Sequence, residues 1–250
     1  MRAIALSFAL VHPIEMLRAV ARSRMAPPGE LAAEAAWGLG ALASEEPAAV
    51  LPACRRLLER QPACGPLWWV CARILTAGDP AREADSCASL LLEDRTPRVL
   101  RSALKGQNGE EPRRAVRQGG IGEVAAADVV VVEVSAIGAE AMVVPASRRG
   151  LLESARASGT PVWVESGVGR LLPSGLWSAL DQHLRDPRDA ASSQARGTRT
   201  SGLGPQSDVI DDLDGVELVF APTGVGRVAD LEEMITESGC PEPSELTSGW

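Results

Sequence analysis

The sequence has 250 residues, of which 45% are hydrophobic and 23% are charged, as is typical of a globular protein with a substantial core. A formal net charge of -8, without any basic stripe, excludes a nucleic-acid partner, because phosphate backbones are bound through clustered basic residues. No apolar stretch has the roughly 18 residues needed to span a bilayer, so we expect no membrane partner either.

The sequence has five cysteines, two histidines and no Cys-x-x-Cys pair, so it lacks the ligand spacing typical of a zinc site. We therefore expect no metal and no cofactor. Most of the cysteines lie in apolar helical stretches, where a free thiol behaves as a small buried hydrophobe, and this favours a reducing, cytoplasmic location. We expect His12 and His183 to be structural rather than catalytic, since neither pairs with a candidate nucleophile.

The first part of the chain is predicted to be helical, because apolar residues recur there at three- and four-residue spacing. The predicted helices cover residues 15–24, 31–42, 48–59, 67–76 and 82–93. The segment "GPLWWVCARIL" is apolar on nearly all sides, so it should be the central helix of this layer. Pro52 should kink or restart the third helix. We assign residues 1–104 to a helical domain.

Residues 105–127 are rich in glycine and charge and are predicted to be a linker with at most one short helix. The pattern then changes. The run "DVVVVEV" from Asp128 is typical of a strand buried on both faces of a parallel sheet. A helix over 147–157, the strand "PVWVE", and a helix from Pro173 to His183 complete a βαβ pattern.

The last third is predicted to continue this α/β domain, which we place at 128–250. Residues 186–208 are polar and rich in Ser, Gly and Arg, so we expect a mobile loop there. The strand "VELVF" and the helix "DLEEMITESG" should follow it. The fold class is therefore α/β, with a helical N-terminal part followed by a Rossmann-like parallel sheet.

A Gly-x-Gly-Arg loop, Gly167 to Arg170, follows the second predicted strand at the sheet edge where ligands of α/β proteins bind. Leu172 stands where a dinucleotide fingerprint has its third glycine, so ordinary dinucleotide binding is disfavoured. Backbone N–H groups near Gly167 and Gly169, together with the Arg170 guanidinium, suit a phosphate, and a plain tight turn is the alternative. We interpret the second copy, 224–227, as a connection.

Glu133 and Ser135 end the first predicted strand at the same edge. A carboxylate there is suited to act as a general base or to hold a ligand hydroxyl, and it is equally suited to cap the next turn. No Gly-x-Ser-x-Gly elbow supplies a nucleophile.

Three stretches together resemble a known superfamily: "RQPACGPLWWVCARILTA", the run from "ADVVVVEV" to "GVGRLLP", and "ADLEEMITESG". In this order they are similar to the regulatory (alpha, beta, delta) subunits of initiation factor 2B and to the related methylthioribose-1-phosphate and ribose-1,5-bisphosphate isomerases. The resemblance implies a homodimer, and it makes Ser147 the opening of a ligand-binding helix. Trp163 and Trp177 are aromatic residues of the kind enriched in interface cores.

The chain departs from this superfamily at two catalytic positions. Ser135 stands where the isomerases carry an aspartate, and none of the five cysteines lies in the isomerases' cysteine motif. The stretch 95–128 is also short, which predicts a sheet truncated in the middle. The leading hypothesis is a protein that binds a phosphorylated sugar or nucleotide through Ser135, Ser147, Gly167, Gly169 and Arg170, without isomerase chemistry. The alternatives are an aldose-ketose isomerase with Glu133 as its base, and a non-catalytic scaffold.

Overall fold

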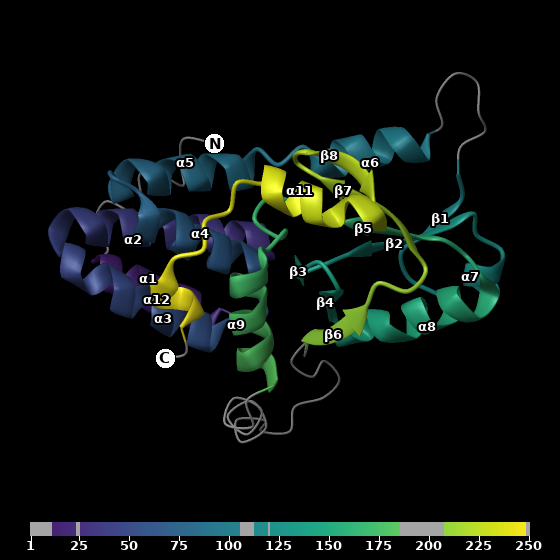
Figure 1. Cartoon of the computed structure of the whole chain (residues 1–250), viewed down its shortest axis with the longest axis horizontal. Helices are drawn as coiled ribbons and strands as arrows, with labels where there is room; N and C mark the ends of the chain where they lie inside the picture. Colours follow the sequence, from purple (N-terminus) through teal and green to yellow (C-terminus); the bar gives the residue numbers. More distant parts are fainter. Residues whose placement is uncertain (1–11, 24–25, 106–112, 120, 186–207, 249–250) are drawn as a thin grey trace.

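The computed structural model describes residues 12–23, 26–105, 113–119, 121–185 and 208–248. The mobile loop expected at 186–208 lies outside this range, except for Asp208, which begins a strand. Figure 1 shows a helical layer on one side and a sheet with its own helices on the other.

The helical layer has the five helices expected from the sequence. They are α1 (Pro13–Arg22), α2 (Pro28–Glu45), α3 (Val50–Arg60), α4 (Gly65–Thr76) and α5 (Pro80–Leu92). A 3-10 turn, η2 (Pro47–Ala49), precedes α3, so Pro52 lies in the first turn of that helix, where proline is tolerated. The N-terminal caps are partly side-chain caps: His12 accepts a hydrogen bond from Ile14 N, and Asp79 accepts one from Arg82 N.

Helix α4 is buried, as its apolar sequence predicts. Trp68 is fully buried, and its indole N–H donates to Pro62 O at 2.9 Å. Its ring meets the edge of His183 with ring centroids 5.6 Å apart. His183 also contacts Ala179 O through Nδ1 at 2.8 Å, so these two contacts tie its ring to the surrounding helices.

The main sheet has the strand order β1-β2-β5-β7-β8. Its strands are β1 (Ala115–Val116), β2 (Val129–Glu133), β5 (Val162–Glu165), β7 (Val216–Ala221) and β8 (Gly224–Arg227). The first four are parallel and β8 is antiparallel to β7. The predicted α/β class is confirmed, and so are the strands predicted from "DVVVVEV", "PVWVE" and "VELVF".

Two sequence interpretations were wrong. Residues 224–227 form the edge strand β8 rather than a connection, because Pro222 and Thr223 make a two-residue turn that folds the chain back on β7. The segment expected to be a linker holds the strand β1 as well as the helix α7 (Ile121–Ala125). β1 pairs with β2, so part of the segment belongs to the sheet.

A second, three-stranded antiparallel sheet was not predicted. It consists of β3 (Ala136–Ile137), β4 (Ala141–Pro145) and β6 (Asp208–Asp212), in the order β3-β4-β6. β4 pairs with β6 along its whole length, from Ala141 opposite Asp212 to Pro145 opposite Asp208. The second sheet therefore fixes Asp208 close to the end of β2.

Helices cover both faces of the main sheet (Figure 1). α8 (Arg149–Ser158) and α11 (Leu231–Glu237) pack on one face against Val130, Val132 and Val164. α6 (Thr96–Leu104), which the sequence did not predict, packs on the other face through Leu100. That face contains Val131, Trp163 and Phe220. Trp163 is thus a residue of the protein's own core and does not support the expected dimer interface.

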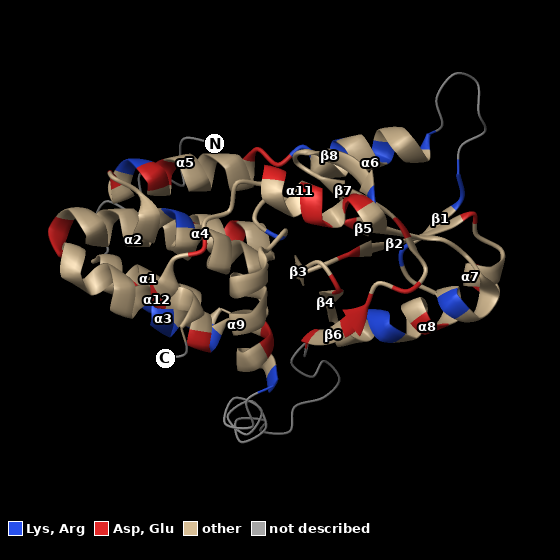
Figure 2. Ribbon diagram, viewed as in Figure 1, with Lys and Arg blue, Asp and Glu red and all other residues tan. Residues whose placement is uncertain are grey.

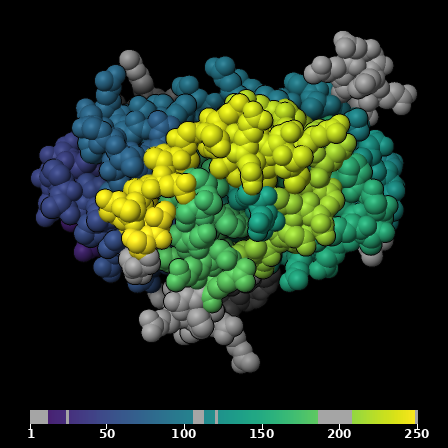
Figure 3. Space-filling model, viewed as in Figure 1, coloured from purple at the N-terminus to yellow at the C-terminus, as the bar shows by residue number. Residues whose placement is uncertain are grey.

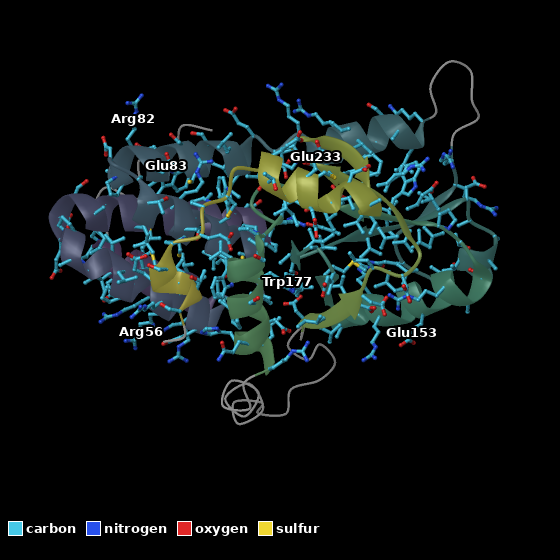
Figure 4. All side chains as sticks on the ribbon, viewed as in Figure 1. Arg56, Arg82, Glu83, Glu153, Trp177 and Glu233 are labelled. Atoms are coloured by element: carbon cyan, nitrogen blue, oxygen red, sulfur yellow. The ribbon has the colours of Figure 1, made fainter. Side chains whose placement is uncertain are left out.

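Two later segments return to the helical layer. Leu176 and Leu180 of α9 (Ser174–Arg185) and Leu246 of α12 (Ser244–Thr247) belong to the same core as α4. Figure 3 shows the C-terminal segment crossing from the α/β part to the helices, beside α9. Trp177 projects from α9 between the two parts (Figure 4), where its ring covers Gly138.

Charged residues of both signs are distributed over both parts of the ribbon, and β6 is acidic (Figure 2). No helix within the described ranges is long and apolar enough to cross a membrane. All five cysteines are free thiols, and four of them are buried.

Candidate functional site

The carboxyl ends of β2 and β5 place two carboxylates side by side. Glu133 and Glu165 are register partners on adjacent parallel strands. Alternation along the strands puts both on the face that holds Val131 and Trp163. Glu165 is buried, whereas the Glu133 side chain is 55% exposed. Two carboxylates on adjacent strands repel each other, and a cationic partner for each one offsets this repulsion.

Arg170 is the partner of Glu133. Its Nη2 donates to Glu133 Oε1 at 2.6 Å, and its Nη1 donates to Val134 O at 2.6 Å. The residue is only 8% exposed. The Gly-x-Gly-Arg loop therefore returns its arginine to the end of β2, where the guanidinium neutralises the exposed carboxylate and satisfies a buried carbonyl.

Arg117 is the partner of Glu165. It follows β1, and its Nη1 donates to Glu165 Oε2 at 2.9 Å, across the end of the intervening strand β2. Arg148, at the start of α8, donates from Nη1 to Arg117 O at 2.8 Å. The Arg117 side chain stays 46% exposed. The edge thus has two adjacent carboxylates, each paired with an arginine, and a third arginine, Arg148, beside Arg117.

Ser135 and Asp208 form a second polar pair behind this edge. Ser135 Oγ donates to Asp208 Oδ1 at 3.2 Å. Burial raises the pKa of Asp208 above its usual value of 3.8, while the hydrogen bond from Ser135 acts in the opposite direction. The main chain of Ser135 is also engaged, since its carbonyl accepts from Gly65 N at 3.1 Å. Ser135 therefore joins β6, the edge and the helical layer.

The raised pKa of Asp208 gives a testable pH dependence. Between pH 3.8 and the raised pKa, the folded protein binds more protons at this group than the unfolded chain does, so this group's contribution to stability falls as the pH rises. We expect Asp208→Asn, which keeps an acceptor for Ser135, to lose that slope and to gain stability relative to the wild type at pH 7. Urea unfolding at pH 4 to 7 measures this, with the exposed Asp214→Asn as the control. Equal pH slopes for the wild type and Asp208→Asn would contradict it.

The Gly167–Arg170 loop is enclosed by the helical layer. Val168 N donates to Asp94 Oδ2 at 3.1 Å. Gly169 has a φ of +74° and leaves no free space, because a Cβ there would lie 3.1 Å from both Pro66 Cα and Trp69 Cβ. The N–H of Val168 is therefore used by a carboxylate. A cavity of about 140 Å³ adjoins the loop, lined by Trp69, Arg73, Leu90, Gly167, Val168, Gly169, Leu171, Pro222, Thr223 and Ser238.

The structure brings together most of the residues singled out in the sequence. Glu133 and Arg170 are in direct contact, and Ser135 is two residues from Glu133. Gly167 and Gly169 line the cavity beside them, and Ser147 is exposed next to Arg148. Sequence reasoning missed Glu165, although it is the last residue of a predicted strand and the rule that selected Glu133 selects it too.

A larger hollow of about 320 Å³ lies at the opposite, amino-terminal edge of the sheet and contains none of these residues. Its arginine, Arg156, is held by Asp211 at 2.6 Å and by Asp212 at 2.7 Å. Arg156 is thus held by two carboxylates, whereas among the described residues Arg148 at the carboxyl edge contacts a backbone carbonyl, so the carboxyl edge is the better candidate despite its smaller cavity.

The structure is a parallel sheet flanked by helices, with a helical N-terminal layer and ion pairs at the carboxyl edge of the sheet. No protein-family model matches the sequence, and no curated protein is significantly similar to it. Solved structures do resemble it. eIF2B beta from Chaetomium thermophilum has a TM-score of 0.61 at 9% identity, covering 94% of this chain and 93% of that one.

Two further structures show the same architecture. The tetrameric eIF2B-beta2-delta2 complex from C. thermophilum has a TM-score of 0.61 at 11% identity, covering 90% of this chain and 94% of that one. Translation initiation factor eIF-2B from Pyrococcus horikoshii OT3 has a TM-score of 0.55 at 11% identity, covering 85% of this chain and 96% of that one. The chain therefore has the fold of the initiation factor 2B subunits, and the resemblance seen in the sequence is confirmed at the level of the fold.

Proposed function

We propose that this protein binds a phosphorylated sugar or nucleotide at the carboxyl edge of its main sheet, in the cytoplasm. The observation that carries the proposal is the row of ion pairs, in which Arg117 meets Glu165 and Arg170 meets Glu133 on neighbouring strands. Carboxylates accept hydrogen bonds from sugar hydroxyls, and guanidinium groups bind phosphate in a bidentate way. Both kinds of group are found here at one edge.

The exposure of the arginines suggests how such a ligand lies. Arg170 is buried and uses both terminal nitrogens within the protein, so its role is to hold Glu133 in place. Arg117 is half exposed, and Arg148 joins it from the turn before α8, which also contains the exposed Ser147. We place the phosphate beside these two arginines and the sugar hydroxyls near Glu133. The roles of Ser135, Gly167 and Gly169 are then to shape the edge.

The chemistry of the thiols favours binding without isomerase catalysis. Burial raises the pKa of the Cys64 thiol to about 12, although Cys64 is the cysteine next to the glycine that contacts Ser135. At neutral pH such a thiol is almost entirely protonated and is a poor nucleophile or base. A scaffold without ligand is the alternative that the following experiment separates.

The test is thermal unfolding with ribose 5-phosphate and with adenosine monophosphate, and with unphosphorylated ribose for comparison. At a ligand concentration 100 times the dissociation constant, linkage stabilises the protein by about 2.7 kcal/mol, which raises Tm by roughly 5 to 11 °C for a chain of this size. We expect the phosphorylated ligands to give this shift. Arg148→Ala should remove most of it, because it deletes a phosphate donor, and Arg170→Ala should abolish it.

Two matched controls make the test specific. Arg149→Ala removes the neighbouring arginine, which is exposed and paired with Glu153 at 3.2 Å, and Arg227→Ala removes the arginine of the second Gly-x-Gly-Arg copy on β8. Each should leave the ligand shift intact, measured against its own unliganded Tm. If no phosphorylated ligand moves Tm, or if all four substitutions act alike, the scaffold alternative replaces the binding proposal.

We also propose that the chain forms a homodimer. A chain of the tetrameric eIF2B-beta2-delta2 complex shares this fold, which supports association through the fold. Trp163 does not contribute to this argument because it is buried within the chain.

A further inference from the structure

We infer that Asp94 is a positioning residue through which the helical layer fixes the Gly167–Arg170 loop, and with it the Glu133–Arg170 pair. The last step, from loop geometry to ligand affinity, rests on the proposed function. Asp94 lies in the connection between α5 and α6, outside the set of residues that the sequence singled out.

The two oxygens of the Asp94 carboxylate accept hydrogen bonds from two different segments of the chain. Oδ1 accepts from Thr96 N at 2.9 Å, which ties it to the start of α6, and Oδ2 accepts from Val168 N at 3.1 Å, which ties it to the loop. A charged acceptor makes stronger hydrogen bonds than a neutral one. Asp94 therefore joins three parts of the molecule at one point: the end of the helical layer, the helix under the sheet, and the loop.

The packing around the loop leaves no room for an alternative arrangement on that side. A Cβ at Gly167 would overlap the Asp94 carboxylate, so the glycine allows the contact. On the opposite side, Gly169 packs against Pro66 and Trp69 of α4. The loop is thus held between Asp94 and α4, and its next residue, Arg170, is directed to Glu133.

Two hydroxyl groups near the N–H partners of Asp94 lack a hydrogen-bond partner of their own within the described part of the chain. Among the described residues, the buried side-chain oxygens without a hydrogen-bond partner are Thr96 Oγ1 and Ser166 Oγ. One belongs to the residue whose N–H Asp94 accepts, and the other directly precedes Gly167. Asp94 is the described acceptor of the N–H groups of Thr96 and Val168, so removing the carboxylate takes away the partner of both. The loop should therefore move when Asp94 is replaced.

The experiment compares the full-length wild type with Asp94→Asn, which has nearly the same shape but meets one of its two N–H partners with an NH₂ group. NMR hydrogen exchange is expected to show the Val168 amide exchanging about tenfold faster or more. The Arg170 side-chain N–H signals, protected by Glu133 and Val134 O, should broaden or exchange faster as well. The dissociation constant for ribose 5-phosphate should rise about tenfold.

Two further variants separate this role from a general effect. Glu93→Gln makes the same charge change at the adjacent exposed residue and should leave all three readouts unchanged. Gly167→Ala disrupts the same contact from the loop side, because its Cβ would overlap the Asp94 carboxylate, and it should reproduce the Asp94→Asn result. Unchanged exchange at Val168, or faster exchange there with unaltered Arg170 signals, overturns the inference. If the wild type does not bind ribose 5-phosphate, the proposed function fails, while the Val168 and Arg170 signals still decide the role of Asp94.

Discussion

Replacing Trp68 by alanine is expected to lower the free energy of unfolding by about 3 to 5 kcal/mol, the usual range for deleting a buried large aromatic side chain. Trp68 is fully buried in α4 and touches His183 of α9. The substitution therefore leaves a cavity where the helical layer meets the returning helix, and it also removes the donor to Pro62 O. For a chain of 250 residues the loss corresponds to a fall in Tm of roughly 6 to 20 °C.

Urea unfolding followed by far-ultraviolet circular dichroism measures this effect. The control is Leu92→Ala, because Leu92 is 50% exposed at the end of α5, and surface substitutions of this kind usually change stability by less than about 0.5 kcal/mol. A loss below about 1 kcal/mol for Trp68→Ala would show that α4 is not the centre of the layer.

Gly65→Ala should destabilise the protein by about 3 kcal/mol, although alanine is the better helix former. A Cβ at this position would lie 2.6 Å from Ser135 O and 2.9 Å from Ala136 Cβ, closer than atoms pack. Overpacking of this kind costs about 1 to 3 kcal/mol. Because Gly65 N also donates to Ser135 O at 3.1 Å, moving α4 away leaves that acceptor unpaired, at about 1 kcal/mol more.

The matched control is Gly29→Ala in α2, where nothing lies within 4 Å of the added Cβ. That substitution should be neutral or stabilising by up to about 1 kcal/mol, because alanine has the higher helix propensity. Opposite signs for two Gly→Ala changes near helix starts would show that contact with Ser135, not helix propensity, governs Gly65. If Gly65→Ala is also stabilising, the close approach between α4 and β3 is not present in solution.

How far the sequence predicts the fold depends on the range of the interactions involved. The β2 strand was predictable because four consecutive valines have no other common explanation than a strand buried on both faces. The β8 strand was not predictable, since Gly-Val-Gly-Arg has little strand propensity. It becomes a strand because the chain folds back there and pairs with β7. β6 was missed for a similar reason: three of its five residues are aspartates, and pairing with β4 determines its conformation.

The candidate site likewise has parts that a local sequence pattern predicts and parts that depend on long-range contacts. Glu133 lies at the end of one predicted strand and Arg170 follows the next, so a local rule placed them both at one edge. Their ion pair, and the position of Asp94, depend on contacts 37 and 74 residues apart in the chain, which no local pattern encodes. Arg117 was hidden because its strand, β1, has only two residues.

The return of α9 and α12 to the helical layer has a consequence for the newly made chain. The five N-terminal helices leave the ribosome first, yet the apolar surface that later receives Leu176, Leu180 and Leu246 stays uncovered until those residues are made. At ordinary rates of synthesis the interval is on the order of ten seconds. During that time the nascent helical layer exposes a hydrophobic surface. We therefore expect chaperones to bind this surface before the α/β part is complete.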